Sequence, residues 1–187
     1  MMIDGDRKKA LALLQTYTKS PNLVKHMLAV EAAMRAYAKH FGENEDWWGA
    51  VGLLHDFDYE RYPDRADHPF KGAEILKTKG YSGDFIKTIL AHASHTNEPR
   101  DTTAKKTIYA VDELCGFIIA VALVKPNKTL AEVEARSIKK KMKDKAFARQ
   151  VNREEILQGA RELGIPLDDH IATVLKALQS ISRELGL

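Results

Sequence analysis

Apolar side chains recur at helical spacing along almost the whole chain, and this periodicity is the strongest limit on the fold. Between residues 21 and 40 the large apolar positions are separated by 4, 3, 4 and 3 residues. Such spacing places them on one face of an α-helix, where they can pack against a core. These positions are Leu23, Met27, Val30, Met34 and Tyr37. The alternation that marks a half-buried strand is not evident, so the sequence predicts an all-α fold.

Residues that start and end helices divide this pattern into segments. Ser20-Pro21 offers an N-cap followed by proline in the first turn, and Gly42 ends the same segment. Thr129 with Glu132 predicts a capping box at the start of a lysine-rich helix. We expect eight or nine helices, at about residues 6–19, 21–40, 44–55, 69–79, 83–95, 103–123, 129–145, 152–163 and 168–185.

The composition is that of a soluble globular protein of one domain, with 44% apolar and 29% charged residues over 187 positions. The net charge of +3 is too small to predict nucleic acid as a partner, although it suits an anionic substrate. Cys115 is the single cysteine, so a disulfide within the chain is excluded. Because no apolar run resembles a signal peptide or a membrane span, we expect a cytoplasmic protein without a membrane partner. The oligomeric state is left open.

Residues that can bind metal occupy inward positions of the expected helices. His26 lies on the apolar stripe of residues 21–40, and the pair His55-Asp56 ends a helix that is apolar on most sides. Asp112 falls on the inward face of residues 103–123. An inward histidine alone is more often a hydrogen-bonded core residue than a ligand. An inward aspartate often pairs helices, and an HD dipeptide often arises by chance. Together they predict a shared divalent ion, because buried imidazoles and carboxylates are costly unless they are paired. Such a shell suits Fe, Mn, Co, Ni or Zn.

Residues 24–117 resemble the HD superfamily of metal-dependent phosphohydrolases. The matching stretches, in order, are KHMLAVEAAMRAYA, VGLLHDFDYERY, HPFKGAEIL, ILAHASH and YAVDELCGF. The resemblance implies an HD-domain helical bundle whose metal ligands are His26, His55, Asp56 and Asp112. We therefore expect an HD-type metal-binding domain over residues 1–127, with a helical C-terminal extension over 128–187 packed on the same domain. The stretch SIKKKMKDKAFA is similar to that of a bacterial and archaeal branch known only as predicted hydrolases, which leaves the substrate open.

Relatives with an HDIG motif carry further histidines and bind two metals, and this sequence has candidates for both added ligands. His68 is in the position that resembles the first. His92 and His95 compete for the second. We favour His92 because of its apolar ILAH context, and His95 is then a candidate contact for substrate phosphate. The chain departs from the motif, since Phe57-Asp58 follow the HD pair in place of Ile-Gly. The sequence therefore allows one ion or two, of Mn, Fe, Co, Ni, Zn or Mg.

These residues predict a phosphomonoesterase or phosphodiesterase that acts on a nucleotide or another small phosphate ester. A divalent ion lowers the pKa of bound water toward ~7 and polarises a phosphoryl oxygen. We expect Asp56 to orient that water, and Asp58 or a histidine outside the ligand set to transfer a proton. Phosphate also needs cations. Arg61, Arg65 and Lys71 are the candidates, each with a solvated surface charge as the alternative.

Two other functions fit the same residues. One is a di-iron oxygenase, which requires both His68 and His92 as ligands. The other is a non-catalytic nucleotide-binding sensor whose metal is structural. The lysines of residues 139–145 predict a solvated helix. The alternative is a segment that folds over the cleft or contacts a polyanion such as nucleic acid. Cys115 and the tryptophans are expected to pack in the core, and His170 to lie at the surface.

Overall fold

The computed structural model describes residues 3–187, and every regular element within them is a helix. The helices are α1 (Arg7–Tyr17), α2 (Pro21–Phe41), α3 (Glu45–Leu54), α4 (Phe70–Thr78), α5 (Gly83–Leu90), α6 (Thr103–Leu123), α7 (Ala135–Met142), α8 (Arg153–Leu163), α9 (Leu167–Ser180) and α10 (Ser182–Leu185). Short 3-10 turns occur at Ile3–Gly5, Ser94–Thr96 and Leu130–Glu132. The predicted all-α fold is confirmed. Each helix of the described residues is too short or too polar to span a lipid bilayer.

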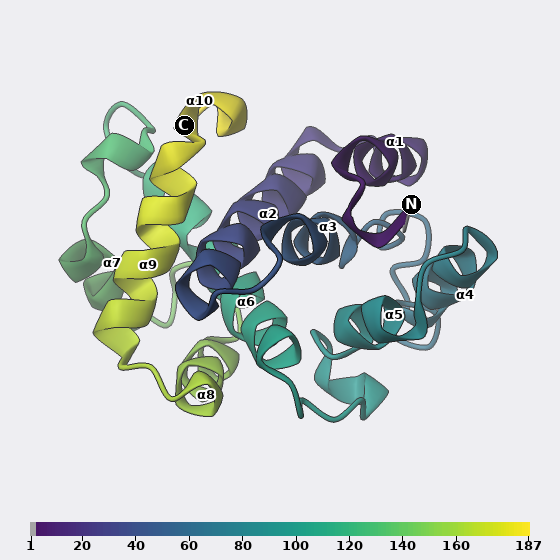
Figure 1. Ribbon diagram of the computed structural model, residues 1–187. Coiled ribbons are helices and arrows are strands. Elements are labelled where there is room, and N and C mark those ends of the chain that lie inside the picture. The colour runs from purple at the N-terminus through teal and green to yellow at the C-terminus, as the bar shows by residue number, and fades with distance from the viewer. Residues whose placement is uncertain (1–2) are drawn as a thin grey trace.

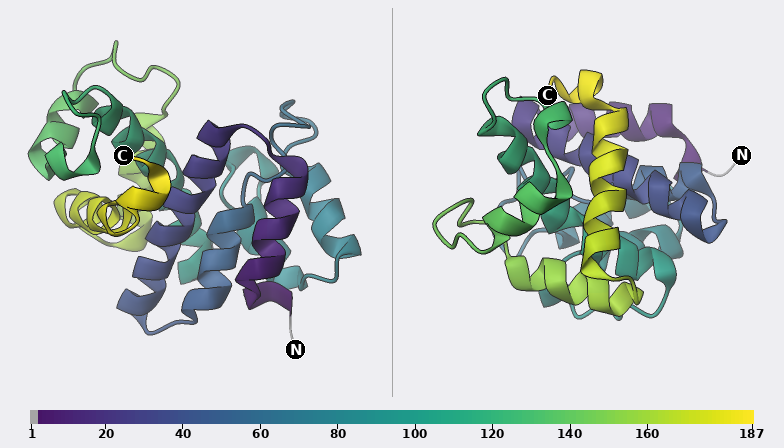
Figure 2. Two further views of the ribbon diagram at one scale, coloured as in Figure 1. Left: turned by 90° about the horizontal axis from the view of Figure 1, so that it is seen from above. Right: turned by 90° about the vertical axis from the view of Figure 1, so that its left-hand side faces the viewer.

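Two long helices, α2 and α6, cross at the centre of the molecule, and the other helices pack around them. On one side α3 lies against α2, α1 against α3, and α4 and α5 against each other. On the opposite side α8 packs on α6, and α9 packs on α2 (Figure 1). Figure 2 shows from above how the two groups flank the central helices. Side chains of α2 and α6 can therefore contact side chains from the helices on either side.

The apolar stripe predicted for α2 faces this core. Met27, Val30 and Met34 are fully buried. A Cβ atom on Gly52 of α3 would lie 2.8 Å from the carbonyl oxygen of Val30, so only glycine lets α3 approach this closely. Gly42 ends α2 in the left-handed conformation, with φ of 73°. The close contact fixes the C-terminal end of α3, where His55 and Asp56 follow, beside α2.

Helix α5 is shorter than the prediction of 83–95. It ends at Leu90, and residues 94–96 form a separate 3-10 turn. The reason lies in His92, whose backbone N–H and ring Nδ1 both bond to the carbonyl oxygen of Ile89. That carbonyl is therefore not available to the backbone N–H of Ala93, which would bind it in a continued helix. His92 and His95 do not share a helix face.

The lysine-rich helix α7 starts later than predicted. Its capping box is formed by Glu134 and Ser137, not by Thr129 and Glu132. The carboxylate of Glu132 instead accepts hydrogen bonds from the backbone and side chain of Asn127. The hydroxyl of Thr129 also donates to Glu132, at 3.4 Å, but Thr129 makes no side-chain capping bond. A short 3-10 turn stands in place of the first helical turn.

Residues 128–187 pack on the central helices. A Cβ atom on Gly159 of α8 would lie 2.7 Å from the Cβ of Ala110, so α8 and α6 approach closely. Lys139 of α7 forms an ion pair with Asp168 of α9 at 2.7 Å. Division of the chain into an HD-type domain and an extension after residue 127 stays a prediction.

The prediction that His170 lies at the surface is wrong. Its side chain is fully buried among α2, α6 and α9. Its Nδ1 lies 2.6 Å from the hydroxyl of Tyr37, and its Nε2 lies 3.0 Å from the carbonyl oxygen of Ala110. Both ring nitrogens thus have partners, which is what allows an imidazole to be buried.

Candidate metal centre

Three residues from separate parts of the chain form the group that we call the inner trio: His26, His55 and Asp112. His26 projects from α2, His55 is the residue that caps α3, and Asp112 lies in the middle of α6. His26 Nε2 lies 2.9 Å from Asp112 Oδ1, and His55 Nε2 lies 3.4 Å from the same oxygen. The candidate ligand atoms all lie within 4.8 Å of one another, which is close enough to hold one metal ion.

A second group, the outer trio, consists of Asp56, His68 and His92. Nε2 of His68 and Nε2 of His92 each lie 3.1 Å from Asp56 Oδ1. The two trios adjoin, because Asp56 follows His55 directly and its Oδ2 lies 3.7 Å from His55 Nε2. The structure therefore brings all six residues that the sequence marks as metal ligands into one centre. Of the two competing histidines, it is His92 that lies beside Asp56.

The centre is partly open to solvent. His55 is fully buried, and the side chains of His68 and His92 are at most 9% exposed. The side chains of His26, Asp56 and Asp112 are each about one-fifth exposed, at 19%, 18% and 20%. Three of the six side chains of the centre are therefore accessible to solvent.

The donor atoms of these residues fit a divalent cation. Nδ1 of His55 lies 2.8 Å from the carbonyl oxygen of Gly52, and Nδ1 of His92 lies 2.7 Å from that of Ile89. Because a carbonyl only accepts, these Nδ1 atoms carry the hydrogen, and Nε2 of the neutral ring presents a lone pair to the carboxylates. Within the described part of the chain, His55 Nε2 and Asp56 Oδ1 are buried without a hydrogen-bond partner. Either a proton on the ring nitrogen or a cation between the two atoms satisfies lone pairs that face one another, and imidazole with carboxylate suits a divalent transition metal.

The imidazoles and carboxylates also shift one another's pKa values. Burial disfavours a charged ring, but Asp56 and Asp112 outweigh it and raise the pKa of His55 to about 9. Burial is likewise outweighed at His68, where Asp56 and Asp58 raise the pKa to about 10. Burial opposes ionisation of Asp56, yet the neighbouring imidazoles hold its pKa well below the usual range. The carboxylates stay ionised and require positive charge beside them, which either protons on the imidazoles or a divalent cation can provide.

Asp58 and His95 lie next to the trios but outside them. The buried carboxylate of Asp58 lies behind His68, with Oδ1 2.9 Å from His68 Nδ1. Its Oδ2 accepts a hydrogen bond from the backbone N–H of Gly72 at 2.8 Å. Nε2 of His95 lies 2.9 Å from the carbonyl oxygen of His68. Transfer of a proton by Asp58 and contact of His95 with phosphate both stay predictions.

The three cations expected near the substrate are turned elsewhere or exposed. Arg61 donates to the carbonyl oxygen of Thr16 and stacks over the ring of Tyr17, with Cζ 4.2 Å from its centroid. Lys71 pairs with Glu74 at 3.2 Å, and Arg65 is exposed. In the described residues, none of the three forms an ion pair with a member of either trio.

Two aromatic residues at the edge of the centre were not expected from the sequence. Tyr59 is 40% exposed, and its ring centroid lies 5.3 Å from that of His68. Phe70 is 38% exposed, and its ring lies 5.9 Å from that of His95. Their sequence signal is proximity alone, since each lies within three residues of a predicted ligand. Helical periodicity does not mark them, because it identifies buried faces and not the rim of a site.

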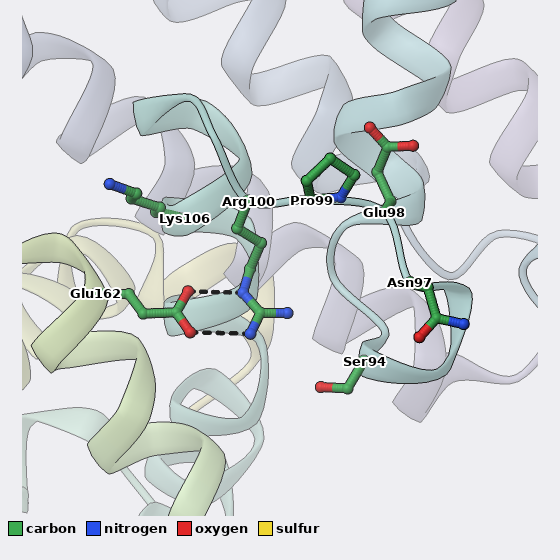
Figure 3. A pocket seen from close by; sticks show the side chains of 7 residues that line it. All are labelled: Ser94, Asn97, Glu98, Pro99, Arg100, Lys106 and Glu162. Carbon is green, nitrogen blue, oxygen red and sulfur yellow. Dashed lines mark hydrogen bonds and ion pairs between the residues drawn. The ribbon is translucent and has the colours of Figure 1, made fainter.

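A shallow pocket of about 460 Å³ lies beside the segment that follows His92 in the sequence (Figure 3). Most of its lining comes from the segment after His92, namely Ser94, Asn97, Glu98, Pro99 and Arg100. Arg100 is held by Glu162 of α8 in two bonds of 2.6 and 2.9 Å, and its guanidinium lies 3.8 Å from the ring centroid of Tyr109. Helix α8 therefore contributes Glu162 to the lining of this pocket.

Comparisons with known proteins agree with the order of these residues. No curated protein and no solved structure matches the chain. The family model described as HD domain matches residues 23–116, which is half of the chain. The match begins three residues before His26 and ends four residues after Asp112, so it includes both trios. The chain therefore belongs to the HD domain family.

Proposed function

We propose that the protein is a divalent-metal-dependent phosphohydrolase that cleaves a nucleotide or another small phosphate ester. The observation that carries the proposal is the pair of adjoining trios, in which His55 and Asp56 bring two sets of metal-binding atoms together. Membership of the HD domain family, whose members are commonly metal-dependent phosphohydrolases, supports the same reaction. Substrate class, the use of two ions and the roles of single residues are parts of the proposal.

The residues of the metal centre have different roles in the proposed reaction. Divalent ions bound there would supply water of lowered pKa and positive charge beside a phosphoryl oxygen. Asp56 joins the trios, since its Oδ1 faces His68 and His92 and its Oδ2 faces His55. This position suits the proposed role of Asp56 in orienting the water that attacks phosphorus. Backbone carbonyls hold the rings of His55 and His92 so that Nε2 points into the centre.

Removal of one ligand from each trio tests the reaction. We expect Asp112→Ala and His68→Ala each to lower kcat/KM by roughly 10²-fold or more, because each leaves an ion incompletely held. The measurement is phosphate or nucleotide release from a panel of monoesters and diesters, with protein loaded in turn with each candidate metal. Asp64→Asn, at an exposed position of the same loop as Asp58, is the matched control and should keep wild-type activity.

Three outcomes would contradict the proposal that the protein is a phosphohydrolase. One is the absence of release from every ester with every metal. Another is oxygen-dependent turnover with two irons per chain, which would identify the di-iron oxygenase. The third is nucleotide binding without turnover that survives Asp56→Ala, which would identify a sensor.

The exposed aromatic residues favour a substrate with a flat ring, such as a nucleobase. Tyr59 and Phe70 are exposed aromatic rings beside His68 and His95, and stacking of a base on an aromatic ring contributes about 1–3 kcal/mol. Tyr59→Ala or Phe70→Ala should therefore raise KM for a nucleoside monophosphate by roughly 5- to 150-fold. KM for glycerol phosphate, which has no ring, should stay as in the wild type. An equal rise of KM for both esters would exclude ring recognition by these residues.

A further inference from the structure

Asp58 is a buried carboxylate with a bond on each oxygen. Its side chain is 1% exposed, Oδ1 faces Nδ1 of His68 at 2.9 Å, and Oδ2 accepts from the N–H of Gly72 at 2.8 Å. We infer that Asp58 is a positioning residue that holds His68 for metal binding and thereby forms the outer half of the metal centre. The inference rests on the outer trio as a metal site, but not on the reaction proposed above.

His68 needs such a partner because its backbone offers none. The rings of His55 and His92 each bond to a carbonyl three residues earlier in the chain, at the end of α3 or α5. His68 instead precedes a helix, and its Nδ1 meets a carboxylate from ten residues earlier. Because an ionised carboxylate only accepts, it keeps the hydrogen on Nδ1 and leaves Nε2 to face Asp56.

Helix α4 holds Asp58 in turn. The N-cap residue of α4 is Pro69, which makes no side-chain capping bond, and the carboxylate of Asp58 accepts from the third residue of the helix instead. A Cβ atom on Gly72 would lie 2.8 Å from Cγ of Asp58, so glycine is required for this approach. The carboxylate of Asp58 thus bonds both to the first turn of α4 and to the His68 ring, and it fixes the orientation of the ring relative to the helix.

The same contacts argue against Asp58 as a group that exchanges protons with substrate. Both oxygens are occupied inside the protein, and the carboxylate faces the side of the ring remote from Nε2. Asp58 therefore acts through His68.

Asp58→Asn tests the inference with little change of shape. The carboxamide oxygen must face the N–H of Gly72, so its NH₂ group faces Nδ1 of His68 and favours hydrogen on Nε2, where it blocks the metal. With Zn²⁺ as the probe, we expect the wild type to bind two ions per chain. The variant should keep the inner ion and bind the outer one roughly 10- to 100-fold more weakly. In ¹⁵N-histidine spectra of the Zn²⁺-loaded wild type, Nε2 of His68 should give the signal of a metal-bound ring. The same signal should be absent from the spectrum of Asp58→Asn.

A second variant keeps the charge and moves the carboxylate. Gly72→Ala should push Asp58 from His68 and weaken the outer ion in the same way, whereas Gly83→Ala, which has open space around it, and Asp64→Asn should bind two ions normally. Retention of both ions with an unchanged His68 signal in Asp58→Asn and Gly72→Ala would overturn the inference. Loss of both ions together, or a wild type that binds a single ion, would overturn it as well. None of these readouts depends on turnover, so failure of the proposed reaction would be seen separately.

Discussion

His170 and Tyr37 form a buried polar pair on the side of the core remote from α4 and α5. Nε2 of His170 faces the carbonyl oxygen of Ala110, so it carries the hydrogen, and Nδ1 accepts from the hydroxyl of Tyr37. This arrangement uses the neutral ring. Burial accordingly lowers the pKa of His170 below its ordinary value.

The pair makes stability depend on pH in a direction that can be measured. As pH falls below ~6.5, the unfolded chain takes up a proton at His170 before the folded protein does. The stability that His170 contributes is therefore present above that pH and is lost below it, by up to ~1.4 kcal/mol per pH unit until the folded pKa is reached. His170→Gln should lower the free energy of unfolding by about 1–3 kcal/mol at pH 7.5 and should lack this loss.

The free energy of unfolding in urea is measured for metal-free wild type and His170→Gln at pH 5.5, 6.5 and 7.5. The difference between the two proteins at each pH gives the contribution of His170, because the other histidines are common to both. Lys176→Gln, at an exposed position of α9, the helix that carries His170, is the matched control and should follow the wild type. A difference between wild type and His170→Gln that does not change with pH would show that the buried ring is not kept neutral.

At the scale of the elements, the close approach of α8 to α6 depends on one glycine. The Cβ of an alanine at position 159 would lie 2.7 Å from the Cβ of Ala110 in a fully packed core, so the helices would have to separate. Gly159→Ala should lower the free energy of unfolding by about 1–3 kcal/mol, even though alanine favours helices over glycine. A fall in Tm of roughly 2–12 °C should follow.

Gly83→Ala provides the control, because nothing lies near the added methyl group and the position is also helical. It should leave Tm within about 2 °C of the wild type, since a surface change usually alters the free energy by less than ~0.5 kcal/mol. Equal Tm values for Gly159→Ala and Gly83→Ala would show that α8 can move away from α6 without loss of packing.

At the scale of the whole molecule, the metal centre joins segments that are distant in the sequence. Its residues come from α2, the end of α3, the turn before α4, the turn after α5, and α6. An ion bound to the folded protein alone should raise the free energy of unfolding by about 2.7 kcal/mol when its concentration is 100 times Kd. Removal of the ion with a chelator should lower Tm correspondingly, as followed by tryptophan fluorescence at constant ionic strength. Equal Tm with and without chelator, in protein shown to release metal, would contradict a centre that links these segments.

Much of the fold can be predicted from sequence because helix limits are local. The ranges 21–40 and 103–123 agree with α2 and α6 to within one residue, since apolar spacing, Pro21 and Gly42 act within a few residues of their position. Where the prediction failed, a side chain bound a nearby backbone group in an unexpected way. His92 bound the carbonyl of Ile89 and ended α5, and Glu132 bound the backbone of Asn127 and delayed α7.

The sequence by itself determined the helical class and the inward direction of His26, His55 and Asp112, because a residue's place on a helix face follows from spacing alone. Only the tertiary structure decided what those inward faces meet. It placed His92 and not His95 beside Asp56, set Asp58 behind His68, and buried His170 against Tyr37. These contacts join residues 10 to 133 positions apart, so they depend on how the helices pack, which periodicity does not contain.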